Sequence, residues 1–458
     1  MDSPPRDDDA PQTDTPTDAA AEPAAVVPRF SPVRPSDYLD FIGEADLARL
    51  ERKAQLLAGL RVVHVNSTFT GGGVAEILSS LTLLQQGLGL RADWRLIQGG
   101  PDFFSVTKKL HNALQGASIH LSAQKKAVYE EVAFQNALRM DLNADLVVVH
   151  DPQPLPLVAH VRRTCPWVWR CHADLSNPDP EVWAYLRPFI EQYDAAVLSL
   201  QEYAQPLAVP QCFFMPAIDP LSVKNRPLSD EEIDHRLAHY GIPQDLPIVT
   251  QIARFDRFKD PQGVIEAFRL ARAEVPATLV LLGNVASDDP EGQEVFESLL
   301  SHKEPRILIL TAEDSALVNS LQRRAAVVLQ KSLREGFGLT VSEAQWKGAA
   351  VIGGDCGGIL HQIAHGMNGF LVDSVEAAAQ RIVELLRDTA LRQRLGAAGR
   401  ETVRKRFLLP RLAEQYLDLA AAFEPTFRPV TTGGGDSSLN WQPGRGGGEV
   451  VEESTSKT

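Results

Sequence analysis

Two glutamates that lie eight residues apart, Glu335 and Glu343, flank a glycine-rich segment in the second half of the chain. An apolar run at 326–330 precedes them, and a helical pattern follows to about Lys347. A carboxylate can accept hydrogen bonds from two hydroxyls of a diol. The amides that open a helix face an anion such as phosphate, helped by the helix dipole. The segment therefore predicts a site for a phosphorylated sugar. An ordinary capped helix with two solvated glutamates is the alternative.

Two cations, Arg254 and Lys259, follow a short β-branched run at 248–252. Such a run predicts a buried strand, and ligands of parallel sheets bind at the carboxyl ends of their strands. Arginine offers a planar fork and lysine a point charge, so the pair could hold different oxygens of one diphosphate. A charged surface loop is the alternative, which the shared sheet edge disfavours.

Three consecutive glycines at 71–73 lie between the predicted strand 61–66 and a helix. A glycine-rich helix start suits the close passage of a diphosphate or a sugar, although a merely tight turn competes with this interpretation. The segment is not GxGxxG, and the acidic residue expected about twenty residues on for a dinucleotide ribose is not evident. These departures disfavour a dinucleotide oxidoreductase.

Polar residues also follow two further predicted strands. Asp151 comes after the run 145–150, and His172 after 166–171. Polar side chains at strand ends suit sugar binding, whereas a histidine is otherwise commonly structural. His361 and His365 have the spacing of a zinc pair but lack the glutamate of HExxH, so we expect a helix face there and no metal site.

The elements that must position these residues alternate between short β-branched runs and helical patterns, which is typical of parallel α/β layers. The first half has a further strand prediction at 195–200. The second half has four more, at 278–282, 306–310, 350–352 and 369–372. An amphipathic helical pattern fills 375–424.

We therefore expect an α/β protein of the two-domain type, with two Rossmann-like domains facing a central cleft. The proline-containing stretch 215–227 is the predicted connection. The expected segments are a disordered acidic and proline-rich tail at 1–27, an N-terminal domain at 28–225, a C-terminal domain with closing helices at 226–425, and a glycine-rich disordered tail at 426–458.

The amino-acid composition disfavours some classes of binding partner. The 458 residues include 45 basic and 59 acidic ones, a net charge of −14, which disfavours binding to nucleic acid or to an anionic membrane. No apolar run approaches the roughly eighteen residues of a membrane span, and the acidic start lacks the features of a secretory signal. The four cysteines show no CxxC spacing. We expect a cytoplasmic protein.

Together these motifs resemble those of retaining glycosyltransferases of the GT-B fold, family four. Glu335 and Glu343 match the E-x7-E motif of that family, and Arg254 and Lys259 match its phosphate-binding pair. Further segments resemble the group of trehalose glycosyltransferring synthases and trehalose phosphorylases, over residues 36–425 as a whole. These segments are 65–78, 150–154, 170–172 and 335–344.

The resemblance implies that glucose passes from a nucleoside diphosphate to free glucose, giving trehalose with retention of configuration in a reversible reaction. It assigns the ribose diol to Glu343 and the donor sugar to Glu335. The implied site has catalytic residues Arg254, Lys259, Glu335 and His172; donor-binding residues Gly72, Gly73, Gly336, Phe337, Gly338, Leu339, Thr340 and Glu343; and acceptor-binding residues Asn66, Asp151, Gln153 and Asp174.

The expected partners are a nucleoside diphosphate glucose and a small sugar, glucose or trehalose. We expect no tightly bound cofactor or metal, although magnesium could assist as a counter-ion. The oligomeric state is left open, with a homodimer as one alternative. The base of the donor is not fixed by the sequence. A trehalose phosphorylase and another disaccharide-forming glycosyltransferase remain alternatives. A catalytically silent nucleotide-sugar sensor is disfavoured because both glutamates and both cations are present.

Overall fold

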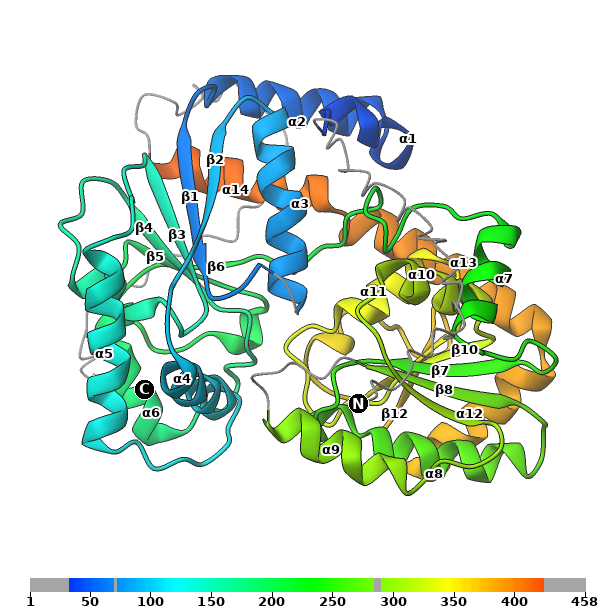
Figure 1. Cartoon of the computed structure of the whole chain (residues 1–458). Helices are drawn as coiled ribbons and strands as arrows, with labels where there is room; N and C mark the ends of the chain where they lie inside the picture. Colours follow the sequence, from blue (N-terminus) through cyan, green and yellow to red (C-terminus); the bar gives the residue numbers. More distant parts are fainter. Residues whose placement is uncertain (1–32, 70–71, 284–289, 424–458) are drawn as a thin grey trace, which may run out of the picture. The chain divides into compact units, whose positions relative to one another are not determined.

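Two parallel six-stranded sheets form the framework of the chain (Figure 1). The computed structural model describes residues 33–69, 72–283 and 290–423, so the predicted tails 1–27 and 426–458 lie outside the described residues. Each sheet is covered by helices on both faces, which confirms the prediction of two Rossmann-like domains. None of the helices in the described ranges combines the length and the apolar character that a membrane span needs.

The first sheet has the strand order β2-β1-β3-β4-β5-β6, and all its pairs are parallel. Its strands are β1 (Arg61–Asn66), β2 (Arg91–Leu96), β3 (Leu146–His150), β4 (Trp167–Arg170), β5 (Ala195–Leu198) and β6 (Gln211–Phe213). The sequence pattern did not predict β2 and β6, which are the two edge strands. β2 carries three charged residues and is only partly buried, and β6 has three residues, so neither shows the apolar run of a central strand.

Helices pack on both faces of the first sheet. One face buries α4 (Pro101–Leu114), α5 (Ala123–Ala137) and α6 (Pro180–Ile190). The other face buries α2 (Glu44–Leu56), α3 (Gly73–Gly87) and α14 (Leu409–Phe423). Short segments complete the domain, namely η1 (Pro35–Tyr38), α1 (Leu39–Ile42), η2 (Leu155–Ala159) and η3 (Gln201–Tyr203).

The position of α14 departs from the predicted domain bounds. The sequence pattern predicts the whole stretch 226–425 in the second domain, but α14 packs in the core of the first. Leu412 and Tyr416 of this helix are buried with Val62 and Leu78 of the first domain. An amphipathic pattern shows that a helix has an apolar face, but it does not say which sheet covers that face.

The second sheet has the order β12-β11-β10-β7-β8-β9, again with parallel pairs only. Its strands are β7 (Ile248–Ile252), β8 (Thr278–Gly283), β9 (Ile307–Thr311), β10 (Val327–Gln330), β11 (Val351–Gly354) and β12 (Phe370–Val372). The predicted second-half strands coincide with these six elements. β7, β8, β10 and β11 are buried throughout, whereas the edge strands β9 and β12 are buried in part. Buried parallel strands are rich in aliphatic and β-branched residues, which made these elements visible in the sequence.

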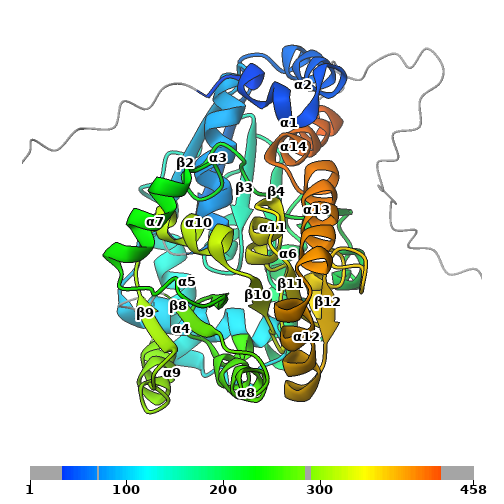
Figure 2. The same ribbon diagram turned by 90° about the vertical axis from the view of Figure 1, so that its right-hand side faces the viewer.

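Helices again cover both faces of this sheet. One face packs α8 (Pro261–Arg272), α9 (Pro290–Leu300) and α12 (Val375–Arg387), and α8 and α12 lie side by side (Figures 1 and 2). The other face packs α7 (Asp230–His239), α10 (Ser315–Arg324) and α11 (Leu339–Trp346). α13 (Thr389–Arg406) contacts α11, and η4 (Arg257–Lys259) and η5 (Gly357–Ile359) are single turns.

The expected helix face at His361 and His365 is wrong. This segment is a turn between η5 and β12. His361 pairs with Glu202, with 3.3 Å between Nε2 and Oε1, and His365 Nδ1 accepts a hydrogen bond of 3.1 Å from the Leu371 amide. The i, i+4 spacing is therefore not the product of a helix here.

Candidate active site

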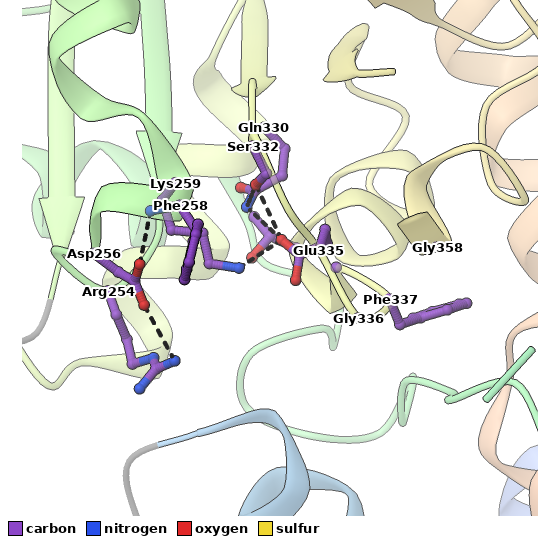
Figure 3. A network of polar contacts seen from close by, with 12 residues as sticks. Arg254, Asp256, Phe258, Lys259, Gln330, Ser332, Glu335, Gly336, Phe337 and Gly358 are labelled. Carbon is purple, nitrogen blue, oxygen red and sulfur yellow. Dashed lines mark hydrogen bonds and ion pairs between the residues drawn. The ribbon is translucent and has the colours of Figure 1, made fainter. Parts of the chain in front are cut away.

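Glu335 lies in the loop between β10 and α11 and is the centre of a buried polar network (Figure 3). Its Oε2 lies 2.6 Å from Lys259 Nζ and also accepts hydrogen bonds from Gln330 Nε2 at 3.2 Å and from Ser332 Oγ at 3.1 Å. The side chains of Glu335 and Lys259 are only 10% and 17% exposed. One cation and two neutral donors thus hold the carboxylate in a fixed position. A fixed position is what a ligand-binding carboxylate needs.

The glycine loop that follows is fixed through its backbone. Tyr203 Oη donates to the Gly336 carbonyl at 2.8 Å, and Gln362 Nε2 donates to the Phe337 carbonyl at 2.6 Å. Gly338 has φ +87°, in the left-handed region that a glycine adopts without strain, and α11 begins at the next residue. The loop therefore presents its backbone in a defined conformation at the start of a helix, where amides can face a phosphate.

Three side chains of this segment pack against, or form a hydrogen bond with, other parts of the protein. Phe337 is buried with its ring 5.4 Å from the ring of Phe407, and Leu339 packs against buried residues of the same cluster. Thr340 Oγ1 donates to the Ile252 carbonyl at 3.3 Å. If these residues bind the donor, as the sequence analysis expects, they do so through their backbone.

Arg254 and Lys259 both follow β7, at the sheet edge that carries Glu335 (Figure 3). Arg254 Nη2 lies 3.7 Å from Asp256 Oδ2, and its side chain is 45% exposed. Lys259, by contrast, points at Glu335. The two cations therefore share an edge, but in this structure each faces a different carboxylate.

Residues of the first domain reach the same loop. A Cβ atom on Gly336 would lie 2.6 Å from the carbonyl oxygen of His172, and 3.6 Å from the amide nitrogen of Asp174. Gly73, in the first turn of α3, faces Leu339 in the same way, because a Cβ on it would lie 2.8 Å from Leu339 Cδ1. The structure thus brings the glycine segments of the two domains against each other's predicted site residues.

We expect Gly336→Ala to lower turnover by about tenfold or more, because the added methyl would push the His172 carbonyl away from the loop and misplace groups that must be held closely. The clash is with backbone, which cannot rotate aside. Steady-state kinetics beside a melting curve checks this. Gly100→Ala is the matched control, since a Cβ there meets nothing within 4 Å. Equal turnover in both variants would contradict a close approach of His172 to the loop.

Glu343 lies in α11 and faces a lysine that the sequence analysis did not single out. Lys224 Nζ lies 3.7 Å from Glu343 Oε1 and also forms an ion pair with Glu76 of α3. Burial raises the pKa of Glu76, and the nearby Glu343 raises it further. Burial lowers the pKa of Lys224, but the two glutamates outweigh it and the net shift is upward. Lys224 is therefore a charged bridge between two carboxylates.

These three side chains line a pocket of about 140 Å³ that also includes residues of the connection between the domains. Lys224 belongs to the stretch 215–227, and nothing in its local sequence marks it as part of a site. Only the fold places it between α3 and α11. Glu76 carried a weak signal, because it follows the triple glycine at the start of a helix.

We expect Glu343→Ala to weaken binding of the nucleotide sugar by about 1.5–3 kcal/mol, the scale for hydrogen bonds to a charged group. Acceptor affinity should change less, because the residues predicted for the acceptor lie in the other domain. Calorimetric titration with donor and with acceptor checks the difference. Glu76→Ala is the matched control, because it removes the other carboxylate that pairs with Lys224. We expect it to change donor affinity less than Glu343→Ala does. Unchanged donor affinity in Glu343→Ala would show that Glu343 does not hold the donor.

The residues predicted for the acceptor lie at the carboxyl ends of β1, β3 and β4. Asp151 has φ +62°, a strained value for a non-glycine residue, and its Oδ1 accepts a hydrogen bond of 2.8 Å from the His172 amide. Burial raises the pKa of Asp151 to about 6. Asn66 Oδ1 accepts from the Thr68 amide at 3.0 Å and from Trp94 Nε1 at 3.2 Å. These two residues therefore hold their loops in place.

Gln153 and Asp174 are both partly exposed at the same edge of the first sheet. Asp174 Oδ1 accepts from the Ser176 amide at 2.8 Å, which closes a turn beside the Gly336 loop. Within residues 33–69, 72–283 and 290–423, no group of three or more His, Cys, Asp or Glu side chains is placed to hold a metal ion.

The sequence was also compared with known proteins. Residues 64–205 match the family model "Trehalose synthase, N-terminal domain", and residues 233–402 match "Glycosyl transferases group 1". A trehalose synthase of Pyrococcus horikoshii is 44% identical over 84% of this chain and 95% of its own length. A trehalose phosphorylase of Grifola frondosa is 28% identical over 72% of this chain and 53% of its own.

Solved structures share the fold. One described as trehalose-6-phosphate from E. coli bound with UDP-2-fluoro glucose superposes with a TM-score of 0.63 at 14% identity, covering 79% of this chain and 98% of its own. An identity this low speaks for the architecture alone.

Proposed function

Because the chain belongs to the trehalose synthase family of glycosyltransferases, we propose that it transfers a glucosyl group from a nucleoside diphosphate glucose to free glucose and so forms trehalose. The chain is a hexosyltransferase of the GT-B fold. One observation supports this donor class most strongly. At one edge of the second sheet lie the cations Arg254 and Lys259, the carboxylate of Glu335 and the start of α11. These groups suit a sugar linked to a diphosphate.

In the proposed reaction the bond between the donor carbon and the diphosphate oxygen breaks. A hydroxyl oxygen of the acceptor bonds to that carbon on the same face, and its proton passes to the departing diphosphate. Arg254, Lys259 and the amides at the start of α11 stabilise the charge that grows on the diphosphate. Glu335 orients the donor sugar, and Glu343 holds the ribose. The acceptor lies near His172, Asp151, Gln153 and Asp174.

The proposed chemistry needs no tightly bound metal, because the cations and helix amides neutralise the leaving group. We expect turnover to survive dialysis against a chelator, with magnesium at most assisting as a counter-ion. Turnover before dialysis, after it, and after adding magnesium back checks this. Complete loss that magnesium restores would contradict the metal-independent mechanism.

The proposal is tested by incubating the protein with glucose and, separately, ADP-, UDP- and GDP-glucose, with NMR to identify the disaccharide. We expect α,α-linked trehalose from at least one donor, because retention keeps the α configuration of the donor carbon and the new bond forms to the α-anomeric hydroxyl of the acceptor. A disaccharide with another linkage would indicate a different acceptor chemistry. Failure with all three donors would contradict the proposed donor class. The same incubation with Lys259→Ala controls for contaminating activity.

A further inference from the structure

Three histidine rings of the first domain form a continuous hydrogen-bonded chain. His64 Nδ1 lies 3.0 Å from His150 Nε2, and His150 Nδ1 lies 3.1 Å from His172 Nε2. At the inner end, His64 Nε2 lies 3.0 Å from Gln85 Oε1. His64, His150 and Gln85 are at most 1% exposed, whereas His172 is partly exposed. The chain therefore runs from the protein core to the predicted sugar site.

Burial disfavours the charged form of all three rings. Burial lowers the pKa of His64 to about 4. Burial also lowers the pKa of His150 well below its ordinary value, and the neighbouring His64, His172 and Arg170 lower it further. For His172, burial and then the Arg170 guanidinium have the same effect. A neutral imidazole has one N–H donor and one acceptor nitrogen, so each ring has two possible tautomers.

The hydrogen bonds make the tautomer of each ring depend on that of its neighbour. Gln85 Oε1 can only accept, so His64 Nε2 carries the hydrogen and His64 Nδ1 accepts. His150 Nε2 must then donate to His64, which leaves His150 Nδ1 to accept from His172 Nε2. Every ring thus carries its hydrogen on Nε2. One reversed ring would set two donors or two acceptors against each other, so the chain can only reverse as a whole.

We propose that His64 and His150 are positioning residues, which fix the His172 ring so that its Nδ1 accepts a hydrogen bond from a sugar hydroxyl. Gln85 sets the direction of the chain. This inference rests on the proposed function for the presence of a sugar beside His172. A ring held by one neighbour alone could rotate or change tautomer, whereas the chain fixes both its orientation and its acceptor atom.

The tautomers are tested directly by long-range ¹H–¹⁵N correlation spectra of the full-length protein with ¹⁵N-labelled histidine. Single substitutions assign the three rings. We expect all three to carry hydrogen on Nε2, and trehalose to shift the Nδ1 signal of His172 more than the signals of His64 and His150. Hydrogen on Nδ1 of His172, or opposite tautomers within the chain, would overturn the proposal. The spectrum does not depend on turnover, so the proposed function can fail independently of this inference.

Kinetics gives a second test, in which Gln85→Glu keeps an acceptor for His64 Nε2 and Gln85→Leu removes it. His150→Phe keeps an aromatic ring but breaks the chain at its centre. We expect His150→Phe to lower kcat by about tenfold, with KM for the donor little changed, and to abolish the single tautomer of His172. Gln85→Glu should keep the Nε2–H tautomers. A His150→Phe protein with normal kcat would overturn the positioning role. If that variant does not fold, the tautomers of Gln85→Leu and Gln85→Glu decide: the same mixture in both would overturn it.

Discussion

Replacing Lys259 with alanine is expected to lower kcat by about a hundredfold or more, the scale for removing one group that stabilises a transition state. The ammonium group is placed at the sheet edge by η4 and held 2.6 Å from Glu335. As the donor bond breaks, charge grows on the diphosphate and its attraction to a fixed cation strengthens. Such a group affects kcat and not merely KM.

Arg254→Ala should lower kcat on the same scale, and the double variant should lose less than the sum because both cations act on one leaving group. Arg257→Ala is the matched control, since this exposed arginine lies in the same turn. Near-normal turnover in both single variants, measured under saturating donor, would contradict the assignment of the cation pair to the donor.

Replacing Glu335 with glutamine is expected to have the second-largest effect, a loss of kcat of about a hundredfold. The substitution keeps the shape of the side chain but removes the charge that Lys259 pairs with in a mostly buried position. Breaking a buried pair by removing one charge costs about 3 kcal/mol of folding stability. We therefore expect turnover and stability to fall together, as measured by steady-state kinetics and denaturant unfolding.

The double variant Glu335→Gln with Lys259→Met separates the two effects. It removes both charges, so most of the lost stability should return while turnover stays low. Ser332→Ala, which removes one neutral donor to the same carboxylate, controls for the network. A double variant that recovers both stability and turnover would show that this pair is structural and not part of the active site.

The sequence predicted the strands of the second sheet more fully than those of the first. β7 and β10 are short buried strands rich in β-branched and aliphatic residues, and the residues that follow them carry the motif. The edge strands β2 and β6 lack such runs, so local pattern could not reveal them. The domain that α14 joins depends on a long return of the chain, which amphipathic spacing does not encode.

The candidate site shows the same limit. The residue types at Glu335 and Lys259 indicated a charged site, but only the structure pairs them with each other. Lys224 lies in a connecting segment, and its position between Glu76 and Glu343 arises from three elements that are distant in sequence. The hydrogen-bonded chain from Gln85 to His172 likewise joins residues of a helix, of the interior of β1 and of the ends of β3 and β4, which no local spacing in the sequence indicates.

The most direct test of the proposed activity is the reverse reaction. The protein is incubated with trehalose and either ADP, UDP, GDP or inorganic phosphate, and the activated glucose that forms is identified by mass spectrometry. We expect a nucleoside diphosphate glucose, formed by the wild-type protein and strongly reduced in Lys259→Ala. Glucose 1-phosphate formed from phosphate, with no nucleotide sugar from any nucleoside diphosphate, would contradict the proposal and indicate a phosphorylase.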